Sequence, residues 1–236
     1  MISLNRNLRD HRIVYLCYLF GRQLDNAVDI SCLGLENVDL NFEPTNFLDR
    51  IFWRFDNTEK HNCTRSLLLD GYTKFFNNQN LVIDNFEIYD NSSNDNISNF
   101  NNRLRPRYQN SFVEIVTESS FASPGYMLTE KTMHSFYACN FPIILAGVGA
   151  VAHLRNMGFD MFDDIIDHSY DQQNNPIDRI TEAIDYNERL LTDGDYVKNL
   201  WTKNRSRFEH NIHTANNITK YYEQRARESW NQLKWQ

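Results

Sequence analysis

Short apolar segments alternate with polar turns at the start of the chain. Residues 1–4 and 28–32 are short and apolar enough to be strands, and residues 13–24 between them are apolar enough for a helix packed under a sheet. A strand, a helix and a second strand in this order predict that the two strands are parallel. We therefore expect an α/β fold.

The same order returns in residues 113–149, VEIVTESSFASPGYMLTEKTMHSFYACNFPIILAGVG. This segment predicts a strand, a loop, a helix that opens at the Thr-Glu-Lys triplet of residues 129–131, and a second strand. Residues 149–157 predict a further helix, with Gly158 as the residue just past its end. Residues 66–76 fit either a helix or an extended segment.

The rest of the chain divides into loops and helices. Residues 77–110 are rich in Asn, Ser and Asp and predict surface loops, while residues 159–171 alternate aromatic and acidic residues, which predicts a strand edge and a turn. From Pro176 onward the apolar residues keep helical spacing. We therefore expect a sheet-containing domain over residues 1–175, with residues 77–110 as a loop-rich insertion. A helical C-terminal tail over residues 176–236 packs on it, and a tail helix that binds a partner is the alternative.

Composition narrows the class of protein. With 236 residues, 41% of them hydrophobic and 14% aromatic, the chain is long and apolar enough to bury a core. The formal net charge of −7 argues against a general nucleic-acid binder, although a local basic cleft is compatible with it. The cysteines form no CxxC pair, so we expect reduced thiols and no structural zinc site. Residues 13–20 are too short for a membrane span and no signal-peptide cleavage site follows them, so we expect a cytoplasmic protein.

The start of the helix predicted after Thr129 is the first candidate site. Backbone N–H groups without partners and the positive end of the helix dipole favour anions there, phosphates above all. Thr129 is a candidate N-cap, Glu130 adds a carboxylate and Lys131 adds a mobile positive charge. A ligand with a phosphate and a ribose would use these three groups together. The alternative is that Glu130 only complements the dipole and Lys131 is a solvated surface residue.

The polar turn predicted over residues 5–12 is the second candidate site. It carries four basic side chains, Arg6, Arg9, His11 and Arg12. The turn follows a parallel strand, and ligands bind at the carboxyl edge of such strands in open α/β sheets. Guanidinium groups offer planar forks of donors that suit a diphosphate. A solvated basic turn is the alternative.

Glu118 and Tyr126 complete the candidate nucleotide site. Glu118 ends the predicted strand, and Tyr126 lies in the loop of small residues that follows it. A loop of this composition is suited to closing over a ligand. The alternatives are a salt bridge at the strand end for Glu118 and core packing for Tyr126.

Two further patterns carry weaker signals. Gly147-Val148-Gly149, between a predicted strand and a predicted helix, is only a fragment of a dinucleotide-binding fingerprint. The acidic residues within 160–171 either coordinate a divalent cation or form a solvated acidic face. The chain contains no nucleophile elbow, P-loop or HExxH motif, so hydrolase and kinase functions have no support.

The block GYMLTEK, followed by a helix and by NFPIILAG, resembles the donor-nucleotide motif of the α1,3-fucosyltransferase-like glycosyltransferases, which belong to the GT-B class. The opening SLNRNLRDHRIVYL is similar to the first strand, loop and helix of the donor domain in that family. The chain also resembles proteins of phages and marine microbes that pair an LNR…HR start with a TEKT block and an LRxxGF segment, here residues 154–159. Residues 3–16 and 113–167 carry the resemblance.

The resemblance implies a Rossmann-like parallel sheet of the GT-B C-terminal donor-domain type and transfer of a sugar from a GDP- or UDP-linked donor. It implies that Glu130 binds the ribose hydroxyls, that Lys131 and Arg12 contact the diphosphate, and that Tyr126 lines the nucleotide pocket. We expect no metal or other cofactor, because arginine and lysine can neutralise the diphosphate.

The family places an acceptor-binding domain, with the catalytic base, ahead of the donor domain, whereas this chain opens at the first strand of the donor domain. We therefore name no catalytic residue. The base lies elsewhere, or a partner chain supplies it, or activity has been lost. The alternative function is a non-catalytic phage structural or accessory protein, virion-associated, that keeps the fold. A nucleic-acid-modifying accessory factor fits the acidic charge less well.

Overall fold

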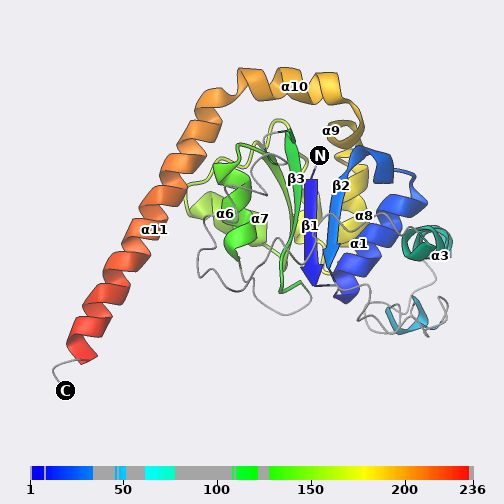
Figure 1. Cartoon of the computed structure of the whole chain (residues 1–236), viewed down its shortest axis with the longest axis horizontal. Helices are drawn as coiled ribbons and strands as arrows, with labels where there is room; N and C mark the ends of the chain where they lie inside the picture. The colour runs from blue at the N-terminus through cyan, green and yellow to red at the C-terminus, as the bar shows by residue number, and fades with distance from the viewer. Residues whose placement is uncertain are drawn as a thin grey trace.

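The computed structural model of the chain describes residues 2–7, 9–33, 46, 48–51, 62–77, 108, 110–121 and 128–233. Within these ranges, four parallel strands form one sheet with helices on both faces (Figure 1). The strands are β1 (Ile2–Asn7), β2 (Asp29–Leu33), β3 (Val113–Thr117) and β4 (Phe141–Leu145). The predicted α/β class and parallel sheet are confirmed.

The strand order β2-β1-β3-β4 creates a switch point in the sheet. The chain winds outward from β1 to β2, crosses back over β1 to β3, and then continues to β4. Ile2 of β1 pairs with Glu114 of β3, so these two strands lie side by side at the point where the direction of winding changes. In open α/β sheets, ligands bind outside the carboxyl ends of the strands at such a point.

The helices cover the two faces in separate groups (Figure 1). On one face α1 (Asp10–Gly21) packs with α8 (Pro176–Asp185), and α3 (Asn62–Asn77) packs on α1. On the opposite face lie α6 (Glu130–Tyr137) and α7 (Ala150–Asn156). Although α8 is the first helix of the predicted C-terminal extension, it packs against α1 and β4 within the main core.

β3 divides its side chains between these two faces. Val113 and Ile115 belong to the core shared with α1 and α8, whereas Val116 belongs to the core under α6 and α7. Because side chains alternate along a strand, Glu114 lies on the same side as Val116. Glu114 is buried there, so the sequence VEIVT places a carboxylate inside the protein beneath α6.

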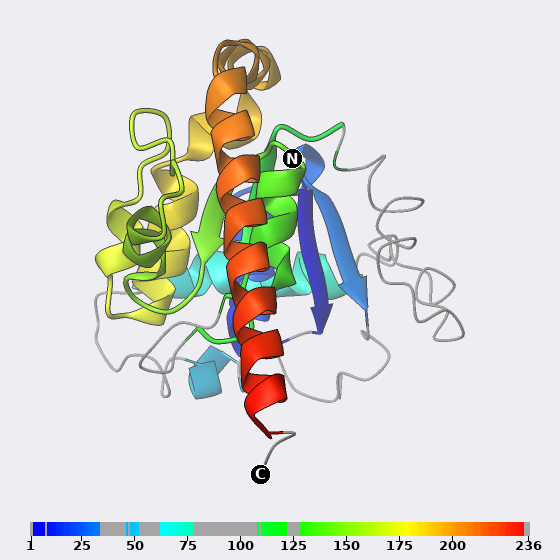
Figure 2. The ribbon, with the colours of Figure 1, turned by 90° about the vertical axis from the view of Figure 1, so that its left-hand side faces the viewer.

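The C-terminal helices form an arch along one side of the molecule (Figures 1 and 2). They are α9 (Glu188–Thr192), α10 (Gly194–Lys203) and α11 (Arg205–Leu233). The first half of α11 contacts α6 and buries Phe208 and Ala215. Its second half continues past the sheet and its covering helices, as both views show.

The turn predicted over residues 5–12 is wrong in its extent. β1 continues to Asn7 because its last residues pair with β2, and α1 already begins at Asp10. Arg6 therefore belongs to the strand and Arg12 to the helix. Pairing with a distant strand thus extends β1 beyond the apolar residues that marked it in the sequence.

The strand edge predicted within residues 159–171 is also wrong. This segment forms turns and a short 3-10 helix, η6 (Ser169–Gln172). Phe162 has a φ angle of +57°, which interrupts an extended strand. The backbone N–H of Asp160 donates to the side-chain oxygen of Asn211 on α11 at 2.8 Å, so a helix rather than a neighbouring strand provides the hydrogen-bond partner.

Several other predicted elements are confirmed. Residues 66–76 lie within α3, residues 150–156 form α7, and Gly158 follows the end of α7 with a φ angle of +93°. Most of the predicted loop segment 77–110 lies outside the described residues. In the described part of the chain, no helix combines the length and the apolar character needed to cross a membrane.

Candidate functional site at the carboxyl edge of the sheet

The first turn of α1 is joined to the end of β3. Arg9 donates from Nη1 to the carbonyl oxygen of Ser119 at 2.9 Å, and Arg12 donates from Nη2 to that of Thr117 at 2.8 Å. His11, between the two arginines, contacts the same segment. The arginine-rich start of the chain and the end of β3 therefore meet at the switch point.

Arg12 lies inside the protein and not in a surface turn as predicted. Its residue is 2% exposed, and its bond to the end of β3 directs the guanidinium inward. Arg9, by contrast, is exposed. The backbone of Arg6 lies in β1, and its side chain is outside the described structure. Of these three arginines, Arg9 is thus the one shown open to solvent.

Two residues that sequence reasoning missed join this basic group. Arg179 of α8 donates from Nη1 to the carbonyl oxygen of Ala146, just after β4, at 3.0 Å. Phe121 stacks on His11 with ring centroids 4.9 Å apart and an interplanar angle of 9°, and the Arg179 guanidinium lies 4.5 Å from the centroid of the same phenyl ring. The sequence carried little signal for Arg179, which stands among the apolar positions that bury α8.

His11 is a neutral imidazole at physiological pH. Burial lowers its pKa to about 3, helped by the positive charges of Arg12, Arg9 and Arg179. Its Nε2 lies 2.9 Å from the carbonyl oxygen of Glu118, and a carbonyl can only accept, so Nε2 carries the proton. The low pKa of His11 reports the positive potential at this edge of the sheet.

The positive charge of this group is only weakly compensated. Burial lowers the pKa of Arg179 to about 10, opposed by the negative charge of Asp171, so Arg179 stays charged at neutral pH. Among the described residues, neither Arg9 nor Arg179 forms an ion pair with a carboxylate. Burying a charge costs free energy unless a partner compensates it. An anionic ligand would supply that partner.

Glu118 holds the start of α6 in place. Its carboxylate accepts hydrogen bonds from the Thr129 N–H at 2.8 Å, from the Thr129 hydroxyl at 2.6 Å and from the Thr132 hydroxyl at 2.6 Å. Thr129 is the N-cap, as predicted, and its Oγ1 accepts from the Lys131 N–H at 3.4 Å. Glu118 is fully buried, and its carboxylate lies where a bound anion would otherwise complement the helix dipole.

Glu130 and Lys131 are closer to solvent at the same helix start. The Glu130 side chain is 67% exposed, and one of its carboxylate oxygens lies 3.5 Å from the Lys131 Nζ. Partial burial alone would raise the pKa of Glu130, but its own backbone N–H and Lys131 lower it below its usual range. A charged carboxylate and an ammonium group thus stand side by side. Tyr126 lies outside the described residues.

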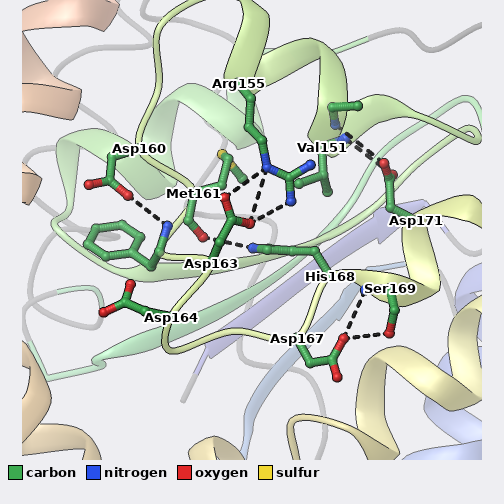
Figure 3. A network of polar contacts seen from close by, with 12 residues as sticks. Val151, Arg155, Asp160, Met161, Asp163, Asp164, Asp167, His168, Ser169 and Asp171 are labelled. Atoms are coloured by element: carbon green, nitrogen blue, oxygen red, sulfur yellow. Dashed lines mark hydrogen bonds and ion pairs between the residues drawn. The ribbon is translucent and has the colours of Figure 1, made fainter.

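The start of α7 also has a carboxylate of the protein bound to it (Figure 3). Asp171 accepts from the Val151 N–H at 3.2 Å and from the Ala152 N–H at 3.3 Å. Gly149 precedes the helix with a φ angle of +81°, a conformation that favours glycine. The Gly147-Val148-Gly149 segment therefore serves as a tight turn, with Asp171 as the anion at the helix start.

The acidic residues that follow α7 are engaged within the protein (Figure 3). Asp163 binds the Arg155 guanidinium, and the Asp167 carboxylate accepts from the Ser169 N–H at 2.9 Å. Asp160 and Asp164 pair with Arg207 of α11, as further ion pairs of this kind. The described residues contain no group of three or more His, Cys, Asp or Glu side chains that could hold a metal ion.

Comparisons with protein-family models, with curated proteins and with solved structures found no match. Function must therefore be inferred from the chemistry of the residues. The described edge of the sheet combines a neutral imidazole, an exposed arginine and two buried arginines with a carboxylate–ammonium pair at a helix start. This arrangement is suited to binding an anion with several negative charges.

Proposed function

We propose that this chain binds a nucleotide sugar at the carboxyl edge of its sheet, as the donor-binding half of a glycosyltransferase with a Rossmann-like fold of the GT-B type. The observation that carries the proposal is the group of guanidinium side chains at the switch point, Arg9, Arg12 and Arg179, around the neutral His11. Neither Arg9 nor Arg179 is ion-paired within the described residues. A diphosphate would supply the missing negative charge.

The residues around this group suit the parts of a nucleotide sugar. Arg9 is accessible and offers a fork of donors to the diphosphate, and Lys131 adds an ammonium group. Glu130 is charged and exposed, as a partner of ribose hydroxyls should be. Arg12 acts through its field from a fixed, buried position, and Tyr126 is kept as a proposed wall of the nucleotide pocket.

The proposed reaction is transfer of a sugar to an acceptor hydroxyl. The acceptor oxygen forms a bond to the anomeric carbon while the bond from that carbon to the diphosphate oxygen breaks, and the acceptor proton passes to a base. Negative charge develops on the departing diphosphate, where Arg9 and Lys131 would stabilise it. No metal is required in this scheme. We assign no base to this chain, and a partner chain with the acceptor domain would provide it.

A non-catalytic role has one observation in its favour. The starts of α6 and α7, which would otherwise attract phosphates, already bind the carboxylates of Glu118 and Asp171. A protein that keeps the fold for assembly could retain these internal contacts without binding a nucleotide. In that case neither binding nor turnover would be observed.

Calorimetry of the purified chain with GDP-, UDP- and ADP-sugars tests the proposal. We expect binding of at least one donor, and a loss of affinity of about tenfold in Glu130→Ala and in Lys131→Ala, because each removes a charge-assisted contact. Lys198→Ala, on the exposed surface of α10, is the matched control and should bind as the wild type does. Absence of binding to every donor would overturn the proposal, and binding without turnover would support a donor half that needs a partner.

A further inference from the structure

Arg179 carries a buried charge for which the folded chain provides little compensation. The residue is 2% exposed, and one guanidinium N–H bonds the Ala146 carbonyl oxygen at 3.0 Å. Its Nε is buried and has no hydrogen-bond acceptor in the described structure. The carboxylate that acts on it, Asp171, is already bound to the start of α7.

The surroundings of Arg179 hold the guanidinium at the edge of the sheet. Phe121 covers it at 4.5 Å, a cation–π distance, and the same ring stacks on His11. A cation–π contact and one carbonyl acceptor together compensate less than the several kcal/mol that burial of an unpaired ion costs. A residue with such a cost and no ion pair is better explained by a ligand than by stability.

We propose that Arg179 is a ligand-binding arginine of this site, whose guanidinium pairs with a phosphate group of the bound molecule. The inference rests on the proposed function for the identity of that molecule, a nucleoside diphosphate. Arg9 and Arg12 lie at the ends of β1 and β3, and Arg179 lies at the end of β4. Since neighbouring strands are about 4.8 Å apart, these groups extend over about 10 Å of the edge, enough for two phosphates.

Arg179→Met tests this assignment with two measurements. We expect the affinity for GDP, UDP, ADP and inorganic pyrophosphate to fall by about tenfold or more in calorimetry, because an ion pair to phosphate is lost. We also expect the thermal midpoint of the free protein to stay unchanged or rise, because an uncompensated buried charge is replaced by an apolar side chain of similar length. Arg179→Lys keeps the charge without the fork and should fall between the two proteins in affinity.

A purely structural arginine would give the opposite result. The thermal midpoint of Arg179→Met would then fall while the affinity of the folded protein stayed unchanged, and this outcome would overturn the inference. Arg207→Met is the matched control, because Arg207 is ion-paired with Asp160 and Asp164 on the outer surface. This variant should lose some thermal stability and keep its affinity.

The two proposals can fail separately. Nucleotide binding that is equal in the wild type and in Arg179→Met would overturn the assignment of Arg179 and leave the proposed function standing. Binding of pyrophosphate but of no nucleotide by the wild type, weakened in Arg179→Met, would support the assignment and overturn the nucleotide-sugar function. A wild type that binds neither pyrophosphate nor a nucleotide would overturn both.

Discussion

Two buried carboxylates four residues apart, Glu114 and Glu118, have different surroundings beneath α6. Glu118 accepts three hydrogen bonds from Thr129 and Thr132. Glu114 accepts one, from the Tyr108 hydroxyl at 2.9 Å. Burial therefore prevails over hydrogen bonding at Glu114 and raises its pKa to about 8, so the residue is mostly protonated at neutral pH.

The protonation of Glu114 predicts a pH dependence of stability. Its carboxyl holds a proton in the folded state at pH values where the unfolded chain, with a pKa of 4.5, has lost it. The contribution of Glu114 to the free energy of unfolding therefore falls as the pH rises from 4.5 to about 8, by up to about 1.4 kcal/mol for each pH unit.

Glu114→Gln isolates this effect, because the amide oxygen still accepts from Tyr108 and carries no charge. Urea unfolding at pH 5 and at pH 8 should show the variant gaining stability relative to the wild type by a few kcal/mol at the higher pH. The remaining titratable groups cancel in the comparison. A difference between the two proteins that does not change with pH would contradict the burial of a protonated Glu114.

At the scale of elements, α1 and α3 approach each other more closely than most helices can. A Cβ atom added at Gly71 of α3 would lie 1.7 Å from the carbonyl oxygen of Cys17, and one at Gly21 of α1 would lie 2.3 Å from that of Leu67. Both obstacles are backbone atoms of the facing helix, which a rotamer change cannot move. The two glycines thus set the distance between the helices.

Gly71→Ala should therefore lower the free energy of unfolding by about 1–3 kcal/mol or more, because the helices must separate to accept the methyl group. Gly194→Ala at the start of α10 is the control, since an added Cβ meets nothing within 4 Å there. Helix propensity should make this second variant neutral or slightly more stable. Equal midpoints in chemical denaturation for the two variants would show that the helices can move apart at little cost.

At the scale of the whole molecule, the sheet and the helices on its two faces form the body, and α11 joins it along half of its length. Phe208 of α11 is 2% exposed and packs on Phe141 of β4 and on Phe162. Tyr221, further along, is 54% exposed. The second half of α11 therefore adds little to the core (Figure 2).

Removal of residues 220–236 should change the free energy of unfolding by less than about 1 kcal/mol, because the deleted part lies past the core. Phe208→Ala should cost about 3–5 kcal/mol, since it leaves a cavity between aromatic rings. Denaturant titration of the two variants against the wild type provides the measurement. A large loss on truncation would mean that the second half of the helix stabilises the body.

The candidate site divides in the same way between sequence and tertiary structure. Thr129 could be recognised as an N-cap because a hydroxyl before a helix has a local role. Arg179 and Phe121 could not be recognised, because they reach the site from segments whose sequences show only a buried helix and a loop. The burial of Arg12 was likewise hidden, since a hydrogen bond to the end of β3 depends on a strand more than a hundred residues away.

The sequence by itself determined the elements whose signals are local: the parallel βαβ units, the strand before Glu118, the helix after Thr129, and the glycine that ends α7. Tertiary structure alone decided where β1 ends, which arginines face solvent, and which anions lie at the starts of α6 and α7. The physical reason is the range of the forces. Apolar periodicity and capping act within a few residues, whereas strand pairing, burial and the sum of charges depend on segments that only folding brings together.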